Sequence, residues 1–88
     1  MTPDEALRLA RRAAQGNRLQ FSRHARDQMA ERGAKVPDVE RACITATVAA
    51  YQGEDVWRLS GGVDTAGDVL VVVASVDIVE VFVVTVFG

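Results

Sequence analysis

The chain has 88 residues, of which 49% are hydrophobic and 25% are charged, and its formal net charge at pH 7 is −2. This length suits one domain, and this composition excludes a disordered segment. The single cysteine excludes an intramolecular disulfide, and no Cys/His spacing resembles a zinc site. We therefore expect no metal, no cofactor and a reducing, cytoplasmic location.

Neither end of the sequence has the pattern of a targeting or membrane segment. Asp4 and Glu5 stand where a secretory signal would be basic, and no long apolar run follows them. The apolar residues 69–87 are interrupted by Asp77 and Glu80, so no uncharged run reaches the roughly 18 residues of a spanning helix. The valine content of this part favours strands.

Basic and acidic residues are unevenly distributed along the chain. Residues 1–46 contain nine Lys/Arg and six Asp/Glu, whereas residues 47–88 contain one arginine and six acidic residues. An anion-binding surface should therefore be built mainly from the first half. The acidic balance of the whole chain argues against tight, non-specific binding to long nucleic acids.

A first helix is expected after Thr2, which can cap it, and Gly16 should end it. Its apolar positions recur at helical spacing but are mostly alanine. Because alanine buries little surface, we expect this helix to lie at the periphery or to contact a partner.

Residues 18–21 alternate polar and apolar side chains and predict a short strand. Ser22 then caps a second helix that Gly33 ends. We expect Ala25, Met29 and Val36 to form the buried side of this helix.

A third helix should open at Pro37. Its buried face is marked by four small or apolar residues at helical spacing, Val39, Ala42, Cys43 and Ala46. We expect Cys43 to be a small buried hydrophobe and not a nucleophile.

The second half of the chain is extended, with strands expected over residues 56–60, 69–76 and 78–87. The last two are apolar on both faces. Such strands either lie centrally, covered on both sides, or present one face to another chain. We expect a homodimer or a partner protein across this sheet.

Four residues are candidates for catalysis: His24, Arg32, Arg58 and Thr85. His24 lies in the first turn of the second helix, where the helix dipole and the neighbouring arginines favour a neutral ring that can act as a general base. Arg32, at the edge of the buried side, could serve the same pocket. Each has a structural alternative: a backbone hydrogen bond for His24, a solvated sheet face for Arg58, and β propensity for Thr85.

Four further residues are candidates for contacting a substrate: Arg23, Arg26, Gln28 and Tyr51. The two arginines flank His24 in sequence, and Gln28 lies on the same side of the helix as His24. No Gly-rich phosphate loop, paired carboxylates, HExxH or nucleotide fingerprint occurs in the chain.

The residues also form a recognisable pattern: Phe21-Ser22-x-His24-Ala25-x-x-x-Met29-x-x-Arg32-Gly33, then Val36, Asp38-Val39, Tyr51 and the closing run 83–87. This pattern resembles a small toxin-like family that is placed with the RelE/ParE toxins and the wider barnase-EndoU-colicin-RelE superfamily. His24, Arg32 and Thr85 match its motif positions, and Arg58 matches less closely.

The resemblance covers residues 18–87 and implies an α+β, RelE-like fold in which N-terminal helices pack on a curved, mainly antiparallel sheet of about four strands. Residues 1–88 are then a single domain with residues 1–16 as an additional N-terminal helix. The resemblance further implies the toxin component of a bacterial toxin–antitoxin system, a metal-independent endoribonuclease that inhibits growth by cutting mRNA or other RNA. Its partners would be RNA and a cognate antitoxin protein.

Two alternatives to RNA cleavage remain open at this point. The net negative charge and the doubly apolar strands suit a catalytically inactive interaction module that acts through the apolar face of its sheet. The second alternative is a gyrase-directed poison, like some relatives of this fold.

Overall fold

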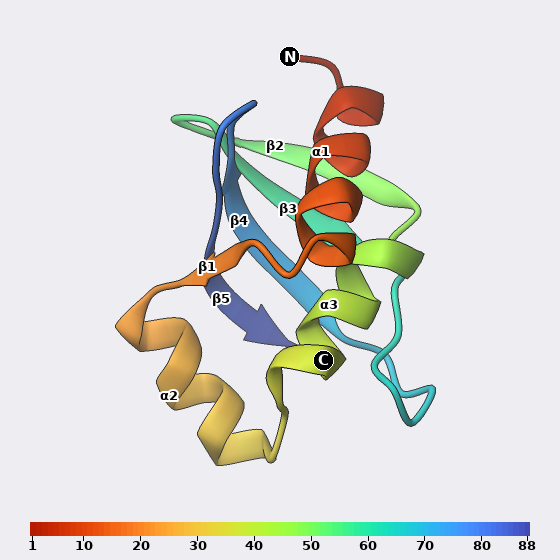
Figure 1. Cartoon of the computed structure of the whole chain (residues 1–88), viewed down its shortest axis with the longest axis vertical. Helices are drawn as coiled ribbons and strands as arrows, with labels where there is room; N and C mark the ends of the chain where they lie inside the picture. The colour runs from red at the N-terminus through yellow and green to blue at the C-terminus, as the bar shows by residue number, and fades with distance from the viewer.

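The computed structural model describes residues 1–88 and has an α+β fold, as the sequence predicts (Figure 1). Three helices and five strands follow in this order: α1 (Pro3–Gln15), β1 (Leu19–Phe21), α2 (Arg23–Arg32), α3 (Val36–Thr45), β2 (Val48–Gly53), β3 (Val56–Ser60), β4 (Val71–Val76) and β5 (Val81–Phe87).

All five strands form one mixed sheet in the order β1-β5-β4-β3-β2. Only β1 and β5 are parallel, and the other three pairs are antiparallel. The sequence predicted about four strands, and β2 is the strand that it did not predict. This strand includes Ala49, Ala50 and Gln52, which have weak β propensity, and its pairing with β3 across a tight hairpin defines it.

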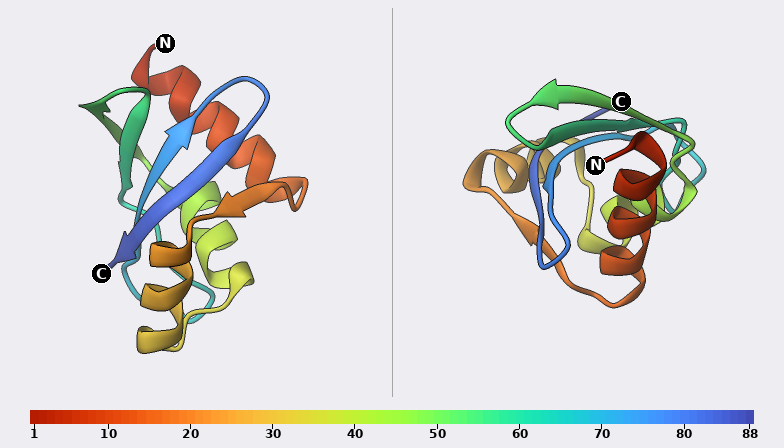
Figure 2. Two further views of the ribbon diagram at one scale, coloured as in Figure 1. Left: turned by 90° about the vertical axis from the view of Figure 1, so that its left-hand side faces the viewer. Right: turned by 90° about the horizontal axis from the view of Figure 1, so that it is seen from above.

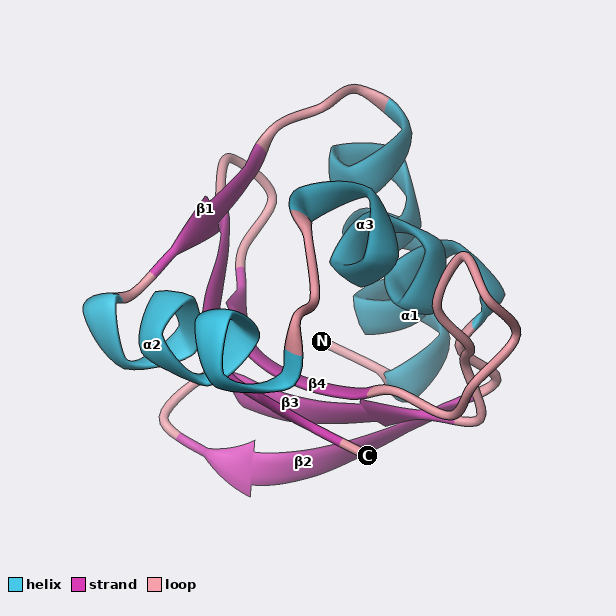
Figure 3. Ribbon diagram, turned by 90° about the horizontal axis from the view of Figure 1, so that it is seen from below, coloured by secondary structure: helices cyan, strands magenta, loops and turns pink.

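The sheet curves around α1, and α1 and α3 lie on the same side of β2, β3 and β4 (Figures 2 and 3). The hydrophobic core lies between these helices and the sheet and comprises 20 buried residues. On the strands, the core side carries residues such as Trp57, Leu59 and Val72. The opposite side, here called the outer face, carries Arg58 and Val73 and is covered by no helix in Figure 3.

Helix α1 is part of the core, contrary to the expected peripheral position. Its four alanines, Ala6, Ala10, Ala13 and Ala14, are each between 0 and 4% exposed. Small side chains allow close approach of the helix to α3 and β2, so packing stabilises α1 although each residue buries little area.

Helix α2 has the termini that the sequence predicts. The Ser22 hydroxyl accepts a hydrogen bond from the Ala25 N–H (3.0 Å), and Gly33 ends the helix with a left-handed φ of 70°. Val36, expected on the buried side of α2, instead begins α3 and is 40% exposed. The left-handed turn at Gly33 redirects the chain before Val36 is reached.

The last strand begins at Val81 and not at residue 78. The Asp77 carboxylate accepts a hydrogen bond from the Val79 N–H, and the Asp77 N–H donates to the Glu80 carbonyl, so the turn continues through Glu80. Ile78 and Val79 are consequently 80% and 85% exposed at its tip.

None of the three helices has both the length and the apolar character needed to cross a membrane.

Candidate functional site

His24, Gln28 and Arg32 form one row along α2, because residues four apart on a helix lie one above the other. The row is oriented by Gln28, which faces β5, the one strand with which α2 makes extensive contact. His24 and Arg32 are exposed at the two ends of the row, and Gln28 is half-buried between them. Helix α2 thus presents an imidazole, an amide and a guanidinium in line.

Gln28 is held by the open edge of β5. Strand β1 pairs only with residues 81–83, so the rest of β5 has no neighbouring strand on that side. The Gln28 Oε1 accepts hydrogen bonds from the Val86 N–H (2.9 Å) and from the Thr85 hydroxyl. This fixes the orientation of the amide, with its Nε2 turned away from the strand.

Ser22 completes the cover of the same edge. Besides capping α2, its hydroxyl donates to the Val84 carbonyl (3.1 Å), and its N–H donates to the Val83 carbonyl (2.8 Å). Gln28 and Ser22 thus form hydrogen bonds with backbone groups of β5 that a neighbouring strand would otherwise pair with. The sequence predicted the helix cap but gave no signal for this pairing.

Arg58 and Thr85 reach the outer face of the sheet from neighbouring positions. Arg58 pairs with Val73 on β4, and Val73 pairs with Thr85 on β5, so all three side chains point to the same face. The Arg58 guanidinium carbon lies 5.1 Å from the centre of the Phe87 ring, within the range of a cation–π contact.

Arg32 lies at the end of the same strand. Its guanidinium packs so closely against Gly88 that a β-carbon at this glycine would overlap Nη2. Arg32 therefore approaches Gly88 from α2, and Arg58 approaches the preceding residue, Phe87, from β3. Gln28, Arg32, Arg58 and Thr85 meet around the C-terminal end of β5, and His24 lies at the other end of the row, about 12 Å along α2 from Arg32. These five residues are here called the cluster.

Three of the other sequence candidates lie outside this cluster. Tyr51 pairs with Trp57, which faces the core, and the two ring centres are 5.0 Å apart, so Tyr51 is on the opposite face from Arg58. The Arg26 guanidinium stacks on the Phe21 ring at 5.6 Å and lines a cavity of about 530 Å³ beside β1. Arg23 is exposed and out of line with the row.

Cys43 takes no part in the site, as the sequence predicts. The thiol is fully buried on α3. Burial raises the pKa of Cys43 to about 12, with a further contribution from the neighbouring Glu40 carboxylate. The thiol is thus protonated at neutral pH and is a poor nucleophile.

The cluster combines one imidazole, two guanidiniums, an amide and a hydroxyl. It can accept a proton and can stabilise negative charge that develops on a bound phosphate. No group of three or more His, Cys, Asp or Glu side chains that could hold a metal ion occurs in the structure.

Residues 21–88 match a protein family that is described as a domain of unknown function, DUF4258. The match includes every residue of the cluster and leaves α1 outside. Neither a curated protein nor a solved structure matches the chain.

Proposed function

We propose that this chain, which belongs to the DUF4258 family, is a metal-independent endoribonuclease and the toxin of a bacterial toxin–antitoxin system. The toxin-like pattern in the sequence suggests the class of activity. The observation that carries the proposal is the row His24–Gln28–Arg32 on α2, with Arg58 reaching the same end of β5.

The reaction uses the chemistry of RNA itself. The 2′-hydroxyl attacks the adjacent phosphorus as His24 takes its proton, and Arg32 and Arg58 stabilise the charge on the phosphorane. The bond from phosphorus to the 5′-oxygen then breaks, and the proton taken by His24 returns to this oxygen through water. The products are a 2′,3′-cyclic phosphate and a 5′-hydroxyl, and DNA is inert because it lacks the 2′-hydroxyl.

Thr85 serves this site through Gln28 and not by direct contact with phosphate. Its hydrogen is engaged by Gln28 Oε1, so the hydroxyl has no proton left to donate to an anion. The Gln28 Nε2, whose direction the two bonds to Oε1 fix, is the donor available to a phosphate oxygen.

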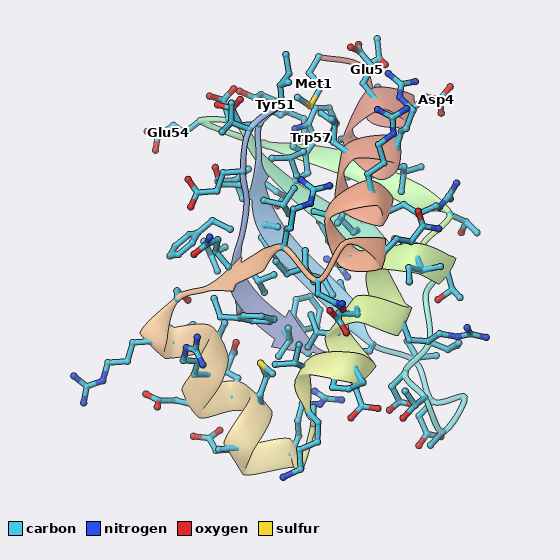
Figure 4. All side chains as sticks on the ribbon, viewed as in Figure 1. Met1, Asp4, Glu5, Tyr51, Glu54 and Trp57 are labelled. Atoms are coloured by element: carbon cyan, nitrogen blue, oxygen red, sulfur yellow. The ribbon has the colours of Figure 1, made fainter.

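The distribution of charge in space also favours RNA binding at α2. Five carboxylates, Asp4, Glu5, Glu54, Asp55 and Asp77, belong to the start of α1 and to the β2–β3 and β4–β5 turns. This acidic end lies opposite to α2 along the long axis of the molecule (Figures 1 and 4). The acidic residues of the β2–β3 and β4–β5 turns therefore lie far from an RNA that is bound at α2.

The test is cleavage of a defined RNA oligonucleotide by the purified protein, with the DNA of the same sequence alongside and EDTA present. We expect His24→Ala to lower the rate by about 10²- to 10⁴-fold, the usual contribution of a general base. Arg32→Ala and Arg58→Ala should each lower it by about 10²- to 10³-fold. Arg41→Ala, which removes an exposed arginine of α3, is the matched control and should cleave like the wild type.

Mass spectrometry of the fragments should find the 2′,3′-cyclic phosphate. In a bacterial host, growth should stop unless the neighbouring gene is expressed, and His24→Ala should relieve the arrest. Wild-type cleavage by His24→Ala would refute the assignment of the base. Intact RNA together with an induced DNA-damage response would indicate a gyrase poison instead.

The second candidate, an interaction module without catalysis, is favoured by the outer face of the sheet. Val56, Val73 and Phe82 are only half-buried there, and no helix covers them. A partner or second copy on this face would also cover Arg58. Light scattering after size exclusion distinguishes the two functions: a dimer that Val73→Asp dissociates, combined with intact RNA, would support the module.

A further inference from the structure

Two adjoining cavities open at the acidic end, where α1 begins. The first, of about 350 Å³, is lined by Met1, Pro3, Tyr51, Asp55 and Trp57. The second, of about 340 Å³, shares Met1 and Asp55 with the first and extends past Glu5, Asp77 and Ile78. Because two residues line both, the cavities are direct neighbours, and together they are here called the N-terminal cleft. Figure 4 shows Met1, Tyr51 and Trp57 together beside the start of α1.

The N-terminal cleft is negatively charged. Three acidic residues line it, Glu5, Asp55 and Asp77, and no Lys, Arg or His does. The α-ammonium group of Met1, which lines both cavities, offsets part of this negative charge. Asp4 and Glu54 lie nearby at the same end of the molecule (Figure 4). A cation that enters the cleft therefore meets more negative than positive charge.

Aromatic rings form one wall of the cleft. Tyr51 and Trp57 pack with their ring planes tilted by 58°, and Tyr51 is 57% exposed. The electron-rich face of an exposed ring attracts a guanidinium or an ammonium group. The neighbouring aliphatic side chain of Ile78 suits the methylenes of a long basic side chain.

Trp57 also carries an unused hydrogen-bond donor. Its side chain is 4% exposed, and Nε1 is the one buried side-chain nitrogen or oxygen in the structure without a hydrogen-bond partner. A buried donor without an acceptor costs free energy, so a carbonyl oxygen that reached it would be favoured. Because Nε1 itself is buried, such an oxygen reaches it only after the indole ring or its neighbours move. A peptide segment supplies such a carbonyl next to its basic side chain, whereas a free metal ion or amine does not.

The turn that positions Asp55 is strained. Glu54 and Asp55 have φ values of 52° and 62°, in the left-handed region where two-residue hairpin turns prefer Asn-Gly. Acidic residues at both positions cost stability and keep carboxylates at the rim of the cleft.

We propose that the N-terminal cleft binds an arginine- or lysine-bearing peptide segment of a partner protein. The basic group lies against the Tyr51 ring and pairs with Asp55. A main-chain carbonyl of the peptide accepts from Trp57 Nε1 once the indole ring has turned towards the cleft. The cleft lies at the opposite end of the molecule from α2, so this binding site is separate from the proposed RNA site (Figures 1 and 4).

The single tryptophan provides a direct measurement, because its indole N–H gives one resonance in the ¹H–¹⁵N spectrum. The probe is the tripeptide acetyl-Arg-Arg-Arg-amide in about 150 mM salt, which screens weak surface attraction. The control is the citrulline tripeptide, which has nearly the same shape but no charge. We expect the arginine peptide to shift the indole resonance to saturation and the citrulline peptide to leave it unmoved.

Four variants test the assignment of residues. Asp55→Asn should weaken binding at least about threefold, whereas Asp68→Asn, which removes an exposed carboxylate elsewhere, should leave it unchanged. Tyr51→Leu should weaken binding about two- to fivefold through loss of the ring, and Tyr51→Phe, which retains the ring, should not. RNA cleavage by all four should match the wild type, so failure here is distinguishable from failure of the proposed nuclease.

The inference is overturned if the indole resonance stays fixed while shifts spread over all acidic residues. It is equally overturned if the citrulline peptide shifts the indole, or if Asp55→Asn and Asp68→Asn weaken binding to the same degree.

Discussion

The side chain of Gln28 connects α2 to β5 through hydrogen bonds. Its Oε1 accepts from Val86 N–H and from the Thr85 hydroxyl, and its Nε2 is left for a ligand. The Oε1 of this side chain is thus a structural acceptor, and its Nε2 is a donor to the substrate in the reaction that we propose. The two roles can be separated by substitution.

We expect Gln28→Ala to destabilise the fold by about 1 to 3 kcal/mol, because the Val86 N–H loses its acceptor in a half-buried position. Gln28→Glu retains the acceptor oxygens, so its stability in urea should match the wild type, while RNA cleavage falls because the Nε2 donors are gone. Gln15→Ala, at an exposed glutamine of α1, is the control. Normal cleavage by Gln28→Glu would remove Gln28 from the substrate site.

The residues of this site were partly foreseeable from the sequence. Spacing on one helix predicted that His24 and Gln28 share a side and that Arg32 lies at the seam between this side and the buried one. The residues 23–32 do form one helix. The bonds of Gln28 and Ser22 to β5 join residues more than 50 positions apart and depend on how far β1 extends, which local patterns do not encode. The face that Tyr51 occupies depends on the register of strand β2, which the sequence did not predict.

At the scale of elements, Asp38 connects the start of α3 to the loop before β4. Its carboxylate accepts hydrogen bonds from the Lys35 N–H (2.8 Å), from the Thr65 N–H (3.1 Å) and from the Thr65 hydroxyl. The Thr65 hydroxyl, followed by these backbone groups, lowers the pKa of Asp38 below its ordinary value of 3.8.

A carboxylate whose pKa is lowered by folding contributes stability above its unfolded pKa, and this contribution disappears as the pH falls through the folded value. We therefore expect Asp38→Asn to be less stable than the wild type at pH 7, with a difference that shrinks once the pH falls below 3.8. Urea unfolding between pH 7 and pH 2 measures this. Asp27→Asn, at an exposed position of α2, is the control, and a constant difference for Asp38→Asn would contradict the linkage.

The elements also show where valine-rich sequence misleads. Residues 78–87 read as one long strand, but the Asp77 side chain binds the Val79 N–H and holds the tip of the hairpin out of the sheet. Strand propensity is an average over side chains, and one carboxylate–backbone hydrogen bond outweighs it locally.

For the whole molecule, α1 is outside the residues matched by the family but inside the core. Four of the 20 core residues are its alanines, and they pack against α3 and β2. The sequence predicted the helix and its cap correctly. It could not predict the position, because a row of alanines has the same pattern whether the helix is peripheral or closely packed.

We expect removal of residues 1–16 to expose this packed surface and abolish cooperative unfolding, with increased binding of a hydrophobic dye. Circular dichroism during heating measures the loss. Arg8→Ala, at an exposed position of α1, should change stability by less than about 0.5 kcal/mol. A truncated chain that unfolds as cooperatively as the full one would show that residues 21–88 fold alone.

The separation of the acidic end from α2 makes the molecule an electric dipole. The chain extends over 32 Å along its longest axis, which runs from the start of α1 to α2 in Figure 1. At physiological ionic strength the Debye length is about 8 Å, so charges at one end are almost fully screened from the other. A polyanion close to the protein therefore interacts mainly with the charges of the end that it faces, and it exerts a torque that turns α2 towards it. The net charge of −2 does not determine which surface of the protein the polyanion meets.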